Sequence, residues 1–410
     1  MPSSLQIWFD RLTTTMFSST LAFTFCGLFL LPSGKSILAN MLVISILFGG
    51  INLLIGRQFN VGLREHRLLW VFIGYAGFIL FNRFVHGDQY GVMRSLGYVV
   101  LFGFLIPRKP IVLKASCYAI IMGGLGMGSL SLWQQLQGIN RVEGFTNAIL
   151  FSQASLTIAL LAWGINKEAR LNIWKRAVTI FSLFMALYSL YASQSRGVWL
   201  AFIFIFGVVM AVKAFHKPRK YMAISLVLLF AGFLFYSHNS VLQERLQASI
   251  SDLKYAENGA YGTSWGLRIV AWQGAWQGFL SSPILGVGTD GFDAMKQALV
   301  ASGVSSPLLL APQLTHSHSQ YMQNLFIRGA TGGLALLLFM GLPMWWAGRS
   351  WGWTSLGVLL PLSYAINGVS DVPFEHQETL FLFVLSLIFC FHFNDSLHIN
   401  STPKIKHNYI

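Results

Sequence analysis

The sequence predicts an all-α polytopic membrane protein with about twelve transmembrane helices and a small helical cap between the ninth and the tenth. Three observations support this prediction. Hydrophobic residues make up 54% of the chain and charged residues only 10%, whereas about 25% of the residues of a soluble domain are charged. Apolar runs long enough to cross about 30 Å of hydrocarbon recur along the chain. A single long polar interval, 237–323, interrupts them.

Twelve apolar runs fit membrane-spanning helices, a few of them only marginally. They cover residues 15–32, 37–56, 66–83, 91–106, 112–134, 147–165, 177–194, 197–213, 221–237, 324–346, 353–368 and 377–393. The first run has no small-residue cleavage site, so we expect a retained helix and no cleaved signal peptide. The runs divide the chain into helices one to nine (1–236), the polar interval (237–323), helices ten to twelve (324–393) and a polar cytoplasmic tail (394–410).

The distribution of basic residues predicts the orientation of the chain. Most of the 28 Lys and Arg residues fall in alternate short loops on the side that also holds both termini. Cytoplasmic loops are rich in Lys and Arg, so both termini are expected in the cytoplasm. The same pattern accounts for the net charge of +14 without a nucleic-acid-binding stripe, so nucleic acid is not an expected partner. The three cysteines lie inside apolar runs and indicate neither disulfides nor a metal site.

The polar interval itself has helical periodicity. Residues 241–254 form an amphipathic stretch, residues 267–280 place large apolar side chains on one face, and residues 290–301 fit a third short helix. A turn rich in Ser, Pro and Gly at 281–288 separates the last two. We therefore expect a helical cap on the outer face of the membrane, partly in the interface.

Two histidines, His316 and His318, end the polar interval directly before an apolar run. Histidine titrates near neutral pH and is the usual residue for proton transfer. The plain alternative is a pair of solvated loop histidines. Asp371, in another outer loop, is an acid that could orient a histidine.

Arginines occupy the outer ends of two predicted helices. Arg196, which follows Ser193 and Ser195, opposes the positive end of an apolar helix, an arrangement that favours phosphate or pyrophosphate binding. Arg268 repeats the pattern in the first turn of the second cap helix. A snorkelling interfacial arginine is the alternative. Arg141 has Glu143 nearby, so it is either a further cation of this kind or simply an ion-pair partner.

No metal and no cofactor are expected. The fourteen acidic residues include no Asp-x-Asp pair of the kind that holds a divalent ion against a diphosphate. His316 and His318 could be zinc ligands, but no acidic residue or cysteine stands near them in sequence.

Four motifs in this order, at the outer ends of the predicted helices, resemble those of the O-antigen ligase and polymerase superfamily. They are Arg141-Val-Glu-Gly144-Phe-Thr-Asn147, Ser195-Arg196-Gly197, Leu267-Arg268 with Trp272 and Pro283-Ile-Leu-Gly286-Val-Gly288, and His318-Ser-Gln-Tyr-Met-Gln323. The resemblance spans about 141–346. In one departure, Ser319 stands where many members have asparagine.

The resemblance implies a metal-independent inverting glycosyltransferase of the bacterial inner membrane with its active site on the periplasmic face. Its donor would be an undecaprenyl-diphosphate-linked glycan, the O-antigen, and its acceptor a sugar of lipid A–core. Arg196 and Arg268 would bind the diphosphate and His318 would be the base. Secondary candidates are His316, Ser195, Arg141, Gln323 and Asp371.

Two other functions remain open at this point. An O-antigen polymerase would share the donor, the fold and the motifs, and the sequence separates it poorly from a ligase. A transporter for a lipid-linked anion would place ionisable residues along a path through the bilayer. Charges in the middle of the predicted helices are scarce, which disfavours transport.

Overall fold

The computed structural model describes residues 4–55, 63–168 and 171–401, and every regular element in these ranges is helical. The elements are α1 (Ser4–Cys26), α2 (Gly34–Leu54), α3 (Leu63–His86), α4 (Tyr90–Leu105), α5 (Pro110–Leu136), α6 (Ala148–Glu168), α7 (Ile173–Ala192), α8 (Arg196–His216), α9 (Pro218–Ser237), α10 (Ser240–Glu257), α11 (Ser264–Ser281), α12 (Phe292–Ala301), η1 (Pro307–Leu310), α13 (Gln320–Trp351), α14 (Leu356–Ser370) and α15 (Gln377–Ser401). The prediction of an all-α membrane protein is confirmed.

Each predicted span overlaps a helix. Within the described ranges, nine helices are long and apolar enough to cross a membrane, namely α2, α3, α5, α6, α7, α8, α9, α13 and α15. The shorter apolar helices α4 and α14, together with α1, match the remaining three runs. The first span is displaced: the run at 15–32 predicts a helix that continues past Cys26, but α1 ends there. Gly27 and Pro32 disfavour helix, although the residues between them are apolar.

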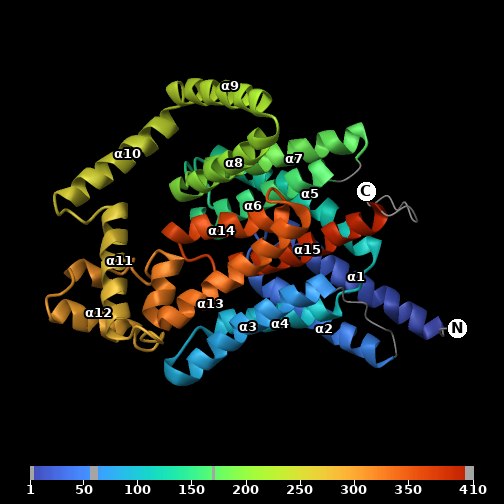
Figure 1. The fold of residues 1–410 in the computed structure, drawn as a ribbon, viewed down its shortest axis with the longest axis horizontal. Helices are drawn as coiled ribbons and strands as arrows, with labels where there is room; N and C mark the ends of the chain where they lie inside the picture. Colours follow the sequence, from blue (N-terminus) through green and yellow to red (C-terminus); the bar gives the residue numbers. More distant parts are fainter. Residues whose placement is uncertain (1–3, 56–62, 169–170, 402–410) are drawn as a thin grey trace.

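The long helices form one bundle (Figure 1). α6 and α15 are almost fully buried inside it, whereas α9 buries no residue and lies at an edge. α10, α11 and α12 lie at one end of the bundle, hereafter the cap end, opposite the first residues of α1 and the last of α15 (Figure 1). The three predicted cap helices thus correspond to α10, α11 and α12. Most of the predicted tail lies outside the described residues, and its first part continues α15.

The turn after α11 is hydrogen-bonded to a break in α13. Gly329 has a non-helical backbone (φ 62°, ψ −160°), which frees backbone groups of the preceding turn. The N–H groups of Val287 and Gly288 donate to two of the freed carbonyls at 2.9 and 3.0 Å. Gly286 has φ +72°, and a Cβ there would lie 2.4 Å from the backbone of α13, so only glycine fits. This contact fixes the cap to the membrane helices.

A buried ion network ties two further loops to α13. Arg328, with no exposed surface, donates to Asp88 before α4 at 2.7 and 2.8 Å and to Glu375 before α15 at 2.7 Å. The amide of Gln320 also donates to Glu375, at 3.1 Å. Removing one partner of such a network leaves an uncompensated buried charge. The network therefore holds the 371–376 loop against the start of α13.

Candidate functional site

A cavity of about 770 Å³ opens among α6, α8, α10, α11 and α14 near the cap end. Its apolar wall includes Trp199, Leu200, Ile203 and Leu246. Its polar lining consists of Arg141, Gln153, Gln194, Ser195, Arg196, Arg245, Ser249, Ser264, Arg268, Asn367, Ser370 and Asp371. Four of these residues are arginines and one is an acid. Such a mixed lining suits an amphiphilic anion.

Arg196 is the first residue of α8, which begins one residue before the predicted start at Gly197. Ser195 stands at the N-cap but its side chain makes no capping hydrogen bond, so the helix start keeps unpaired backbone N–H groups. The Arg196 guanidinium donates to Ser249 at 2.9 Å and to Asp252 at 3.3 Å, both on α10. These bonds hold its charge at the cavity wall, beside the positive end of a helix.

Arg268 lies one turn further into its helix than the sequence indicates. It is the fifth residue of α11, and Thr263 caps that helix by accepting from the Gly266 N–H. The guanidinium donates to the hydroxyl of Ser264 at 3.0 Å and to the carbonyl of Ser370 at 3.4 Å. Arg268 thereby bridges the cap and the end of α14.

Arg141 also faces the cavity. Its Nε donates to the Ser193 carbonyl at 3.2 Å, and the described residues show no hydrogen bond or ion pair between Arg141 and Glu143. Arg141 is therefore not in direct contact with that acid, although the charge of Glu143 still acts on it. A fourth cation, Arg245 on α10, donates to Gln194 at 3.0 Å. Sequence reasoning missed it, although it lies within the amphipathic stretch 241–254.

The positive charges of these arginines repel one another. Burial lowers the pKa of Arg268, and the charges of Arg196 and Arg141 lower it further, while Asp371 opposes the shift. Burial likewise lowers the pKa of Arg141, followed by the charges of Arg245 and Arg196. Because these guanidinium groups repel one another in a partly desolvated space, an anion bound among them would be stabilised.

The two histidines contact each other directly before α13. The backbone N–H of His318 donates to Nδ1 of His316 at 3.1 Å, and the ring centroids are 4.3 Å apart. His318 has φ +47°, a left-handed conformation that is unusual for a non-glycine residue. Its Nε2 lies 3.3 Å from the Gln313 carbonyl, so this nitrogen carries the hydrogen. Nδ1 of His318 is buried and has no partner in the described chain.

Both histidines are held neutral. Burial is the main reason that the pKa of His316 falls to about 3, with the nearby histidines and Arg268 adding to the shift. Burial and the charge of Arg268 lower the pKa of His318, against the opposing effects of the Gln313 carbonyl and Asp371. A neutral imidazole with a free Nδ1 can accept a proton. His318 has such an atom, whereas Nδ1 of His316 is already occupied.

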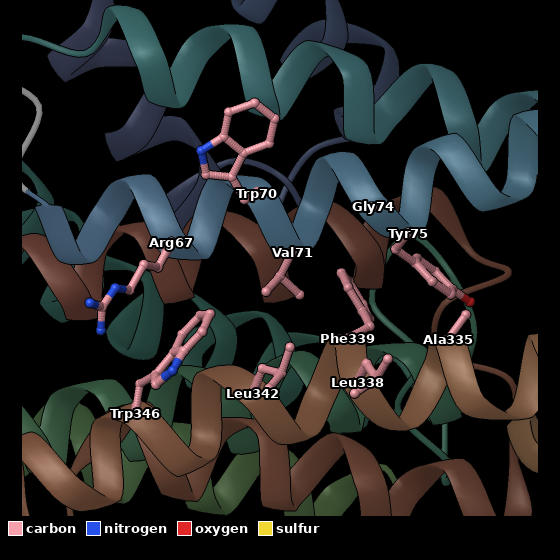
Figure 2. Close-up of a pocket in the computed structure, with 10 residues that line it drawn as sticks. All are labelled: Arg67, Trp70, Val71, Gly74, Tyr75, Ala335, Leu338, Phe339, Leu342 and Trp346. Carbon is pink, nitrogen blue, oxygen red and sulfur yellow. The ribbon is translucent and has the colours of Figure 1, made fainter.

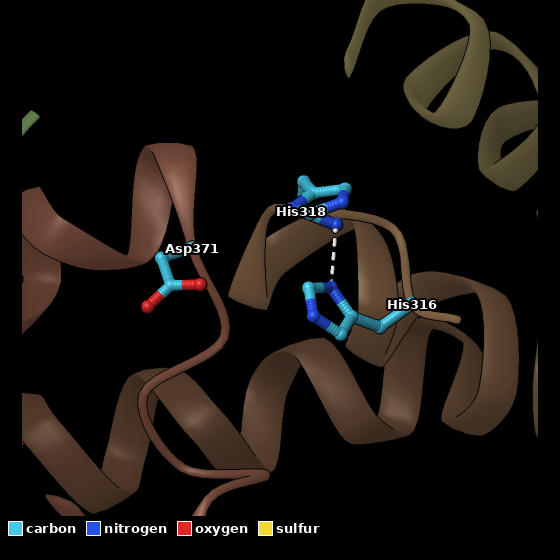
Figure 3. A group of neighbouring side chains, drawn as sticks. All are labelled: His316, His318 and Asp371. Carbon is cyan, nitrogen blue, oxygen red and sulfur yellow. Dashed lines mark hydrogen bonds between the residues drawn. The ribbon is translucent and has the colours of Figure 1, made fainter. Parts of the chain in front are cut away.

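Asp371 connects the histidines with the cavity. It follows α14, lines the cavity and lies beside the two histidines on a separate segment (Figure 3). One ligand atom from each of the three residues lies within 4.8 Å of the others. The Gln153 amide, on α6, donates to the Asp371 carboxylate at 2.7 Å. Sequence reasoning did not find Gln153, although an amide within an apolar run was a usable signal.

Gln323 has a supporting position. Its side-chain oxygen accepts from the Ser317 N–H at 2.8 Å, which orders the segment between the two histidines. It does not line the cavity. The resemblance therefore identifies a residue that shapes the histidine segment.

His316, His318 and Asp371 could together hold a metal ion. The expectation that no metal binds rested partly on the absence of a neighbouring acid in the sequence, and the fold supplies that acid from a distant segment. The charge of Arg268, which acts on both histidines, opposes a cation at this position.

Two comparisons relate this chain to known proteins. Residues 180–337 match the family model described as O-antigen ligase. This range contains Arg196, Arg268, His316 and His318, and excludes Arg141 and Asp371. A Haemophilus influenzae protein described as uncharacterized is 23% identical over 300 residues, which cover 71% of this chain and 74% of that protein.

Proposed function

Because the chain belongs to the O-antigen ligase superfamily, we propose that it is itself an O-antigen ligase. It transfers a glycan from undecaprenyl diphosphate to a sugar hydroxyl of lipid A–core and so completes lipopolysaccharide. It acts in the bacterial inner membrane, with the cavity open to the periplasm and both termini in the cytoplasm. The main support is one observation. Four arginines line a cavity, and Asp371, which lines the same cavity, lies beside His316 and His318.

The cavity lining matches the two parts of such a donor. Arg196 and Arg268 face the diphosphate, whose oxygens accept paired N–H groups from a planar guanidinium. Arg141 and Arg245 add positive charge around it. The apolar wall formed by α8 and α10 suits the first isoprenoid units of the lipid.

The proposed reaction is a single displacement. Nδ1 of His318 takes the proton of the acceptor hydroxyl as its oxygen forms a bond to the anomeric carbon. The bond between that carbon and the phosphate oxygen breaks, and undecaprenyl diphosphate leaves with the bonding electrons. The arginines stabilise the negative charge that develops on the leaving group. Attack from the face opposite the leaving group inverts the anomeric configuration.

The function is tested with purified protein, an undecaprenyl-diphosphate glycan and two acceptors offered in parallel. A ligase forms product on lipid A–core. Longer lipid-linked glycan without modified lipid A–core would identify a polymerase. If neither product forms in protein that retains its fold, glycosyl transfer is rejected and transport of a lipid-linked anion has to be tested.

Metal removal is expected to leave transfer unchanged. The positive charge of Arg268 near the histidines disfavours a cation there, and the arginines supply the charge needed for the diphosphate. The measurement is the initial rate after treatment with EDTA or with a zinc-selective chelator. Inhibition that added magnesium or zinc reverses would overturn the metal-independent mechanism. Zinc rescue that is lost in Asp371→Asn would place the ion among the three candidate ligands.

Gln153→Glu is expected to make transfer depend on pH. The new carboxyl faces Asp371, and two carboxyl groups at hydrogen-bond distance titrate as a pair with one raised apparent pKa. Below that pKa they share a proton and stay hydrogen-bonded, and above it both are charged. At pH 8 both carboxyl groups are charged and repel each other, and Asp371 loses the hydrogen bond that holds it beside the histidines. The variant should then be roughly tenfold or more slower than wild type, the cost of a lost hydrogen bond to a charged group. Its rate relative to wild type should recover as the pH falls to 6. Gln153→Ala is the control, with a deficit that stays constant. A constant deficit in Gln153→Glu would reject the positioning of Asp371 by Gln153.

A further inference from the structure

A second hollow, of about 580 Å³, lies between α3 and α13 (Figure 2). Arg67 and Trp346 mark one of its ends, and Tyr75 and Ala335 lie at the other. Among the residues that the structure describes, Arg67 is the one charged residue of its lining, and the others are apolar or aromatic, apart from a glycine. The hollow is an apolar groove with a single cation at one end.

The groove lies beside a point where α3 and α13 pack closely, because the rings of Tyr75 and Phe339 stack with their centroids 4.4 Å apart. A Cβ at Gly74 would meet no atom within 4 Å, whereas one at Gly124, inside the bundle, would lie 2.3 Å from Ser182. The walls are open: Trp70 is 64% and Leu338 46% exposed. Both helices are long and apolar enough to cross a membrane, and in a membrane these open walls would face lipid. Hydrocarbon that fills it regains the dispersion contacts that an empty gap would lose.

The charged end of the groove lies across the membrane from the candidate site. α13 is broken at Gly329, and the part after the break, residues 330–351, is about 33 Å long, enough to cross a hydrocarbon core of about 30 Å. The histidines precede its first residue, and Trp346 lies in its last turns. A lipid headgroup at Arg67 therefore belongs to the opposite leaflet from a donor bound in the arginine-lined cavity.

We propose that this groove binds one acyl chain of an anionic phospholipid whose phosphate pairs with Arg67. Charge complementarity selects the headgroup: Arg67 is exposed, and none of the ion pairs found among the described residues involves it. Trp346 lies beside Arg67 at that end, as aromatic side chains do at a membrane interface. The guanidinium donates to the phosphate oxygens. One basic residue near the surface corresponds to a preference of about fivefold for an anionic lipid.

Native mass spectrometry of the full chain tests this proposal. Protein is released from nanodiscs that contain equal amounts of phosphatidylglycerol and phosphatidylcholine, and the retained lipids are identified by mass. Wild type should retain one phosphatidylglycerol with about fivefold preference. Arg67→Gln should lose the preference, and Gly74→Leu, which fills the groove, should lose the retained lipid.

Gly77→Leu is the matched control. Gly77 is also on α3, a Cβ there meets no atom within 4 Å, and the residue does not line the groove. Its variant should retain lipid as wild type does. The proposal is overturned if wild type retains both lipids equally or retains neither. It is also overturned if wild type retains a polyprenyl lipid in their place. A third contradicting result is that Gly74→Leu keeps the phospholipid to the same extent as Gly77→Leu. Thermal stability of each variant shows whether a loss reflects unfolding.

Discussion

Replacing His318 with alanine is expected to lower glycan transfer at least a hundredfold, because a positioned general base contributes roughly 10²- to 10⁴-fold. His316→Ala should cost less, about fivefold. Its Nδ1 only accepts the backbone N–H of His318, and such a hydrogen bond is worth roughly 1 kcal/mol. The measurement is the initial rate of transfer to lipid A–core by each purified variant.

His216→Ala is the control for these variants, because His216 is exposed on the last turn of α8. It should transfer at the wild-type rate. Membrane insertion and donor binding should be unchanged in His318→Ala, since the imidazole takes no part in the buried ion network. Near-normal transfer in both His316→Ala and His318→Ala would exclude a histidine base.

Arg196→Lys and Arg268→Lys are expected to reduce kcat/KM for the donor although each keeps its positive charge. A lysine cannot reproduce the planar fork that binds two phosphate oxygens together. Arg268→Lys should have the larger effect, on the order of a hundredfold, the cost of losing one donor to a developing negative charge. Arg268 also bridges Ser264 and Ser370, and lysine would lose one of these bonds.

Arg349→Lys is the matched control for the arginine variants. Arg349 is an exposed arginine at the far end of α13, so its replacement should leave kcat/KM unchanged. Wild-type turnover in Arg196→Lys and Arg268→Lys would mean that these residues are ordinary interfacial arginines. The diphosphate would then have to bind elsewhere.

The sequence was sufficient for the membrane helices because burial in lipid selects apolar residues along an entire span. Local hydropathy does not show where a helix stops inside an apolar run, and for this reason the first span was misplaced. The periodicity of the polar interval located α10, α11 and α12. It could not reveal that the turn at Pro283–Gly288 bonds to the break at Gly329, because that contact depends on the tertiary fold.

The candidate site was only partly predictable. Arg196 and Arg268 could be found because each arginine lies near a helix start, where an anion is favoured. That both line one cavity with Arg141 depends on the packing of separate elements. Asp371 and Gln153, which are hydrogen-bonded to each other, are far apart in sequence, and neither carries a local motif. The groove at Gly74 was equally hidden, since a glycine in an apolar helix can mark either close packing or open space.

The role of His318 as the base is tested most directly by the pH dependence of kcat/KM in wild type and in two Arg268 variants. The neutral imidazole is the active form, and burial and Arg268 lower its pKa. Wild-type kcat/KM should therefore be constant near neutral pH and fall only below pH 6.5, the ordinary value for histidine. Arg268→Gln removes a charge that lowers the pKa, so its acid limb should move up toward 6.5. Arg268→Lys keeps the charge, so its limb should stay in place. An acid limb that lies at the same pH in all three proteins, or no fall in kcat/KM at any acid pH, would contradict the assignment of His318.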